Sequence, residues 1–172
     1  VTLNRPFYVS IYEITNQQFS AYKAQHVGGP ANQPATKVSW QDAANFCNWL
    51  SQKENLIPFY RTSAKRVTGY NSRANGYRLL SEAEWEWLAR RAGKQKTTTF
   101  TWGDSFVIPP KTVNVADESA KGQVPYYVPR YTDGYSGVAP VGSFSKEICG
   151  LYDLGGNVSE WIHDVYTIPA AS

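Results

Sequence analysis

The chain has 172 residues, a net charge of +3 and 42% hydrophobic residues, which is enough for one globular domain with a sizeable core. Its basic residues are scattered among acidic ones, so we expect no nucleic-acid partner. No apolar run is long enough to cross a bilayer, so we expect no membrane insertion in this segment. The sequence begins with Val1 rather than Met, and we expect a single domain over residues 1–172, cut from a longer protein at both ends.

The first half of the sequence predicts one strand and three capped helices. The alternating run FYVSIYEIT, residues 7–15, is typical of a half-buried strand. Each helix is expected behind a Ser or Thr that is followed three residues later by an acidic or amide side chain. These pairs are Thr15 with Gln18, Ser39 with Asp42, and Ser81 with Glu84. Gly93 is a natural stop for the third helix.

The second half, residues 94–150, shows no sustained hydrophobic period, and prolines and glycines interrupt it throughout. We expect an ordered but irregular lobe rather than disorder, because frequent aromatic side chains would be poor solvent-exposed residues. These side chains are Trp102, Phe106, Tyr126, Tyr127, Tyr131 and Tyr135. Irregular backbone lacks ladder partners, so its peptide groups must bond side chains, water or ions.

Three segments together resemble the formylglycine-generating enzyme, or sulfatase-modifying factor, family. They are KVSWQDAANFCNWLS (37–51), GYRLLSEAEWEWLARRAG (76–93) and APVGSFSKEICGLYDLGGNVSEWIHD (139–164). Companion motifs at residues 12–22 and 100–104 follow the family's order and spacing over nearly the whole chain. The resemblance implies an α+β fold, a variant of the C-type lectin architecture with little regular secondary structure.

The same resemblance implies two calcium sites. The implied ligands of the first are the side chains or carbonyl oxygens of Asp153, Gly156, Val158 and Glu160. Carboxylates and main-chain carbonyls are oxygen ligands that suit Ca²⁺. We expect Leu151, Tyr152 and Trp161 to hold both ends of this loop in the core. Asn157 lies in an Asn-Val-Ser triplet, but inside this packed motif we expect a turn residue rather than a glycosylation acceptor.

The second implied calcium site joins two separate loops. Its implied ligands are the side chains of Asn114 and Asp133 and the carbonyl oxygens of Val115 and Tyr135. At each of the two sites the residue types alone favour an Asx-turn or a helix cap without metal. The resemblance favours calcium at both sites.

Catalytic members of the family bind copper(I) with a pair of thiols near the C-terminus, and soft thiolates suit that ion. Nothing in this chain matches the pair, so we expect copper only if such thiols follow beyond Ser172. Cys47 falls on the apolar face of a predicted helix and is expected to be a buried structural thiol. Cys149 lies in a loop, and the sequence leaves open whether the two thiols are bridged. His26 and His163 lack the spacing of metal ligands.

We therefore expect a non-catalytic binding or interaction module with a protein or peptide partner. The alternative is the scaffold part of a copper-dependent oxidase that converts a sulfatase cysteine to formylglycine. A third hypothesis, non-haem iron chemistry as in sulfoxide-forming enzymes with a related domain, is the least favoured, since it requires a His-rich partner domain. Localisation is undetermined, with the periplasm or the extracellular space favoured.

Overall fold

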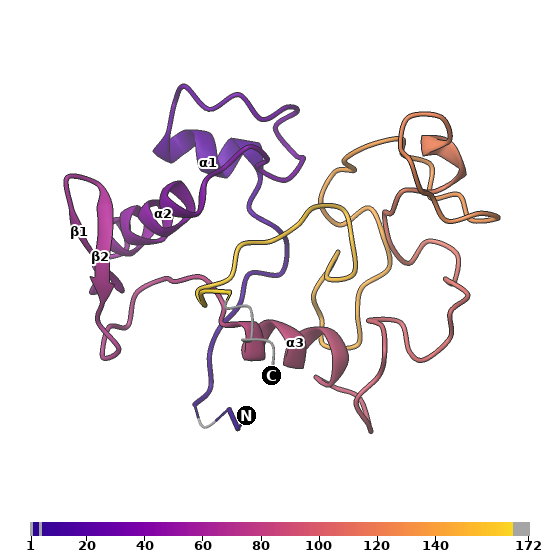
Figure 1. Ribbon diagram of the computed structural model, residues 1–172. Helices are drawn as coiled ribbons and strands as arrows, with labels where there is room; N and C mark the ends of the chain where they lie inside the picture. Colours follow the sequence, from indigo (N-terminus) through magenta and orange to yellow (C-terminus); the bar gives the residue numbers. More distant parts are fainter. Residues whose placement is uncertain (1, 4, 167–172) are drawn as a thin grey trace, which may run out of the picture. The chain divides into compact units, whose positions relative to one another are not determined.

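The computed structural model describes residues 2–3 and 5–166, and few of them are in regular elements (Figure 1). The elements are α1 (Asn16–Tyr22), α2 (Trp40–Lys53), β1 (Tyr60–Ser63), β2 (Arg66–Tyr70), α3 (Glu82–Arg90) and the 3₁₀ helix η1 (Glu118–Ala120). The described residues form two compact units: a hairpin unit of residues 39–85 and 160–166, and a loop unit of residues 2–38 and 86–159. None of the helices in the described residues has the length and apolar character needed to cross a membrane.

All three predicted helix caps are confirmed. The Thr15 hydroxyl accepts the Gln18 N–H at 3.2 Å, and the Gln18 side chain accepts the Thr15 N–H at 2.9 Å, which is a complete capping box. Ser39 and Ser81 also accept an amide from the first turn of their helices. Gly93 adopts a φ of +74° after α3, as a helix stop requires. These caps form from side chains three residues apart, so the local sequence is sufficient to specify them.

The predicted strand over residues 7–15 is wrong. The segment makes one isolated bridge, between Thr15 and Pro34, and no ladder. The Ile11 carbonyl accepts a single amide bond, from Tyr152. A segment with alternating side chains becomes a strand only where an adjacent backbone segment offers a row of hydrogen-bond partners. Residues 7–15 meet only isolated backbone partners.

The hairpin unit contains a hairpin that no sequence pattern predicts. Strands β1 and β2 pair antiparallel, with Tyr60 opposite Tyr70. The turn residues Ala64 and Lys65 adopt φ values of 47° and 65°. Hairpin turns with two positive φ values usually carry Asn, Asp or Gly. Because this turn has none of them, the usual sequence sign is missing.

The core of the hairpin unit lies between α2 and the hairpin, which run side by side in Figure 1. Its buried and partly buried members are Ala44, Phe59, Tyr60, Trp40, Cys47, Val67, Ala74 and Leu79. The Asn48 side chain donates to the Tyr60 carbonyl at 2.7 Å and accepts the Tyr60 N–H at 3.1 Å, so a buried amide fixes the helix to the first strand.

Both cysteines are free thiols. Cys47 packs against the core of the hairpin unit, and burial raises its pKa to about 12. Only the thiolate is nucleophilic or binds metal strongly, so this thiol is unreactive near neutral pH. The prediction that Cys47 packs in the core as a structural thiol is confirmed, although the residue is half-buried and not fully buried.

The loop unit is ordered with little regular structure after α3, as predicted; Figure 1 shows η1 followed by loops. Side chains replace the missing ladders. The buried Tyr131 hydroxyl, for example, donates to the Val113 carbonyl at 2.8 Å. The expectation that the aromatic side chains avoid solvent fails for Phe106 and Tyr126, each 87% exposed. Both lie in runs of exposed residues, so neither ring reaches the core.

Candidate metal-binding loops

The four residues of the second predicted calcium site lie together in the loop unit. Asp133 organises them, because its Oδ2 accepts the Val115 N–H at 2.9 Å and its Oδ1 accepts the Tyr135 N–H at 2.7 Å. Asn114, next to Val115, is buried, and its side-chain amide donates to the Gly137 carbonyl at 2.8 Å. One carboxylate thus ties together the two stretches of chain that carry the predicted ligands.

A second carboxylate, Asp117, supports this arrangement and is fully buried. Its Oδ1 accepts the Ser119 N–H at 2.7 Å, and its Oδ2 accepts the Asp133 N–H. Burial alone would raise the pKa of Asp117, but these hydrogen bonds outweigh it and hold the pKa below the ordinary value. Asp117 is the N-cap of η1. An Asp two residues before a Ser is therefore the sequence pattern from which this supporting residue could have been predicted.

The first predicted site is built on the loop that carries Asp153, Gly156 and Val158, also in the loop unit. Asp153 Oδ2 accepts the Gly142 N–H at 2.7 Å, whereas Asp153 Oδ1 is buried without a hydrogen-bond partner. Burial raises the pKa of Asp153, and the bond from Gly142 opposes this only in part. A Cβ at Gly156 would lie 2.2 Å from the Asn114 carbonyl oxygen, so the close approach of the two loops requires glycine.

The remaining predicted ligand, Glu160, belongs to the hairpin unit, where its carboxylate accepts the Trp85 indole N–H. The expected anchoring of the loop ends is confirmed for Leu151, which is buried, and Tyr152 is half-buried. It is wrong for Trp161, which is 54% exposed. The chain is exposed throughout residues 159–161, so the indole has no core to enter.

Asn157 connects the two predicted sites within the loop unit. Its backbone N–H donates to the Asn114 carbonyl at 2.9 Å, and its Oδ1 accepts the Asn114 side-chain amide at 2.9 Å. Its Oδ1 also accepts the Ala139 N–H at 2.8 Å, and its Nδ2 donates to Glu13 Oε2 at 2.9 Å. With a φ of +67° and this set of partners, Asn157 is an internal turn residue, as expected from the sequence.

This donor set suits a hard cation rather than a soft one. In the part of the chain that the structure describes, no three His, Cys, Asp or Glu side chains gather in a way that could hold a metal. An ion would therefore depend on single carboxylates together with carbonyl and amide oxygens, which are Ca²⁺ ligands. A buried carboxylate oxygen without a partner is costly, and a cation would supply the partner that Asp153 Oδ1 lacks. The residues fit calcium, most clearly at Asp153.

Comparison with known proteins identifies the family. Residues 1–170 match the family described as the sulfatase-modifying factor enzyme 1-like domain. The chain is 32% identical to the chaperone protein LppX of Paenibacillus barcinonensis over 98% of this chain and 65% of LppX. It is 32% identical to the formylglycine-generating enzyme of Mus musculus over 80% of this chain and 29% of that protein. It is 33% identical to the inactive C-alpha-formylglycine-generating enzyme 2 of Bos taurus, over 77% and 33% respectively.

Solved structures agree with this assignment. CarF superposes with a TM-score of 0.67 at 28% identity, covering 93% of this chain and 69% of CarF. PvdO from Pseudomonas aeruginosa gives a TM-score of 0.62 at 27% identity, covering 92% of this chain and 56% of PvdO.

The described residues thus form a fold of mixed helix and strand content, with few helices and a small sheet. The chain belongs to the sulfatase-modifying factor enzyme 1-like family, as its motifs predict. It spans 65% of the length of LppX and about a third of the formylglycine-generating enzymes that it matches, 29% for the mouse protein.

Proposed function

We propose that this chain is a calcium-stabilised, non-catalytic binding module with a protein or peptide partner. The observation that carries the calcium part is Asp153 Oδ1, a buried carboxylate oxygen without a partner in a loop whose carbonyls are predicted ligands. We also propose that the fold is the C-type lectin-like variant, in which loops rather than sheets make up most of the surface.

Calcium, when bound, would supply a divalent charge that compensates buried carboxylates. Asp153 and the carbonyls of Gly156 and Val158, all in the loop unit, would hold it at the first site. Asp133 already spans the two loops of the second site through its bonds to backbone amides, so there an ion would add to an existing tie. We therefore expect the larger part of the stabilisation to come from the first site.

The second site would be completed by Asn114, Val115 and Tyr135. Asn114 is also bonded to Asn157, which lies between Gly156 and Val158 of the first site. Because two hydrogen bonds between Asn114 and Asn157 link the two loops, binding at either site should stiffen the other.

Cys47 does not supply a reactive thiol within this chain. The sequence contains two cysteines, and Cys47 is held as a protonated thiol in a core. Among the relatives, LppX is named a chaperone and the bovine protein is named inactive, which favours binding of polypeptides over oxidation of a substrate. The partner class we propose is therefore a protein or a peptide.

Thermal unfolding of the metal-free protein with and without calcium tests the first part. A ligand at 100 times its Kd stabilises the folded state by about 2.7 kcal/mol, which corresponds to a rise in Tm of roughly 5–10 °C for a chain of this size. Asp153→Asn should remove most of this rise and Asp133→Asn a smaller part. The matched control is Asp104→Asn, a surface carboxylate paired with Lys96, which should retain the full rise. If neither calcium nor a chelator changes the Tm of the wild-type protein, the calcium proposal is refuted.

The alternative is the scaffold part of a copper-dependent formylglycine-generating oxidase, which the 32% identity to the mouse enzyme favours. Incubation of the full-length protein with copper(I), oxygen and a cysteine-containing sulfatase peptide, followed by aldehyde trapping, distinguishes the two. The binding proposal predicts no aldehyde. It also predicts that the protein reproducibly enriches particular peptide sequences from a displayed library, and that this enrichment is lost when a calcium chelator is added. Aldehyde formation would establish the alternative, and a library without enrichment would remove the peptide-binding proposal.

A further inference from the structure

The hairpin unit contains a pocket of about 340 Å³ that none of the predicted calcium ligands lines. This volume lies at the lower end of the range of small-molecule sites. Its lining comes from α2, the hairpin and the segment of residues 160–166, and is mostly apolar. The lining residues are Trp40, Tyr60, Val67, Gly69, Tyr70, His163, Asp164 and Val165.

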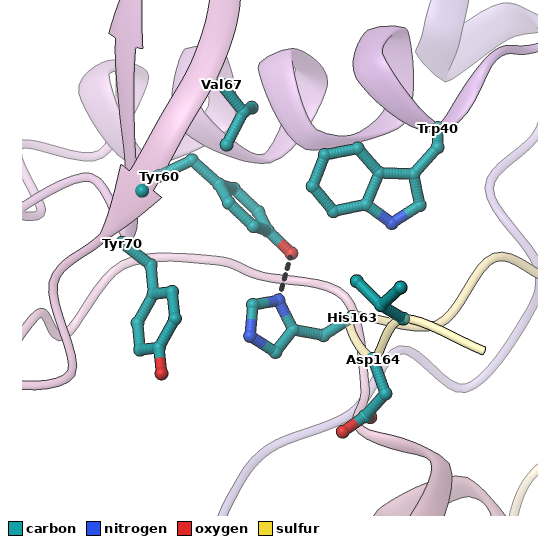
Figure 2. Close-up of a pocket in the computed structure, with 8 residues that line it drawn as sticks. Trp40, Tyr60, Val67, Tyr70, His163 and Asp164 are labelled. Atoms are coloured by element: carbon teal, nitrogen blue, oxygen red, sulfur yellow. Dashed lines mark hydrogen bonds between the residues drawn. The ribbon is translucent and has the colours of Figure 1, made fainter. Parts of the chain in front are cut away.

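The aromatic rings of this pocket stand at steep angles to one another (Figure 2). The Trp40 and Tyr60 rings are 5.6 Å apart with an interplanar angle of 78°, and the Tyr70 and His163 rings are 5.1 Å apart at 89°. The Tyr60 and His163 rings meet at 47°. Rings so inclined line the pocket from several directions, like the walls of a box. The shape suits a compact, rounded group.

The walls are fixed by hydrogen bonds and packing. The Trp40 indole N–H donates to the Ile162 carbonyl at 2.8 Å, and the Tyr60 hydroxyl lies 3.4 Å from His163 Nδ1. Tyr70 stacks on the buried Phe59 ring at 5.4 Å with an angle of 8°, although Tyr70 itself is 53% exposed. The box therefore exists before any ligand arrives, with Tyr70 at its open side.

The charges around the box favour a cation. No Lys or Arg lines it, and its one carboxylate is Asp164. Asp164 Oδ2 accepts the Glu82 N–H at 2.7 Å. Arg78 does not line the pocket; its guanidinium lies over the Phe59 ring and is paired with Glu84 at 2.6 Å. Aromatic ring faces attract cations through their quadrupole.

We propose that this box binds a quaternary ammonium group, with Trp40, Tyr60, Tyr70 and His163 as its aromatic walls and Asp164 as the negative charge at its edge. The proposal is independent of the calcium sites, because none of these residues is a predicted calcium ligand. A free small molecule or a trimethylated lysine side chain of a partner protein could supply the group, and both share this chemistry.

The test compares choline with 3,3-dimethylbutan-1-ol, its neutral isostere, by calorimetric titration of both compounds in the same buffer. Cation–π attraction from several walls should make choline bind about fivefold more tightly or better. A trimethyllysine peptide, titrated beside the unmethylated peptide, distinguishes a partner protein from a free ligand. The proposal is wrong if choline fails to bind or if both isosteres bind equally.

Three variants complete the design. Tyr70→Leu removes an aromatic wall at an exposed position and should weaken choline binding by about threefold or more, whereas Tyr70→Phe keeps the ring and should bind as the wild type does. Tyr77→Leu is the matched control, since Tyr77 is a partly exposed tyrosine of the same unit outside the pocket. Equal choline affinity for Tyr70→Leu and wild type would overturn the assignment, and circular dichroism verifies that each variant is folded.

Discussion

Replacement of Asn157 by alanine should strongly destabilise the loop unit. The Asn157 side chain makes four hydrogen bonds, two through Oδ1 and two through Nδ2, to Asn114, Ala139 and Glu13. An intramolecular hydrogen bond contributes about 1 kcal/mol net to stability. In the alanine variant the buried partners Asn114 and Ala139 would lose their hydrogen bonds to Asn157 without gaining bonds to water. We expect Asn157→Ala to lower the free energy of unfolding by about 3–4 kcal/mol.

Part of this cost comes from the backbone, because Asn157 has a φ of +67° and alanine tolerates that region less well than asparagine. Asn55 provides the matched control. It has a φ of +57°, is exposed and makes no side-chain hydrogen bond among the described residues. Asn55→Ala should therefore cost about 1 kcal/mol or less, from backbone strain alone.

Urea unfolding, followed by far-UV circular dichroism and tryptophan fluorescence, measures both variants under the same conditions. The difference between them isolates the side-chain network, and we expect it to be about 2–3 kcal/mol. A difference below about 0.5 kcal/mol would mean that water satisfies these groups equally well, and the network would not hold the loops together.

Two further predictions follow from ionisation. Burial alone would raise the pKa of Glu84, but hydrogen bonds from Arg78 and Ser81 lower it below 4.5. The ionised form therefore contributes stability above the unfolded-state pKa, and this stability is lost as the pH falls through the folded-state pKa. Glu84→Gln should flatten the fall of Tm below about pH 4.5, and parallel curves for variant and wild type would contradict this. For Cys47, whose pKa is about 12, we expect alkylation by iodoacetamide at least about tenfold slower in the native protein than in urea, measured by peptide mass spectrometry. Equal rates would show that the thiol is accessible.

The helices illustrate what local sequence is able to specify. Thr15, Ser39 and Ser81 each form a cap with a group three residues away, so a short window contains all the interacting atoms. Family membership could likewise be predicted, because it depends on motifs that stand in order along the chain. The strand prediction over residues 7–15 failed because a strand requires a partner, and the window contained none.

The candidate calcium loops lie between these cases. The ligand positions of the second site could be named from motif resemblance, and the structure brings Asn114, Val115, Asp133 and Tyr135 together. The supporting role of Asp117 and the bonds that run from Asn157 to a distant Glu13 could not be read from a window, since their partners lie up to 144 residues away.

The sequence by itself determined the capped helices, the family and the residue types that suit calcium, because each of these depends on neighbours along the chain or on motif order. The tertiary structure alone decided which carboxylate oxygen is buried without a partner and which four rings from separate segments line one pocket. The physical reason is that burial and ring orientation arise from contacts between distant residues, and no local pattern encodes them.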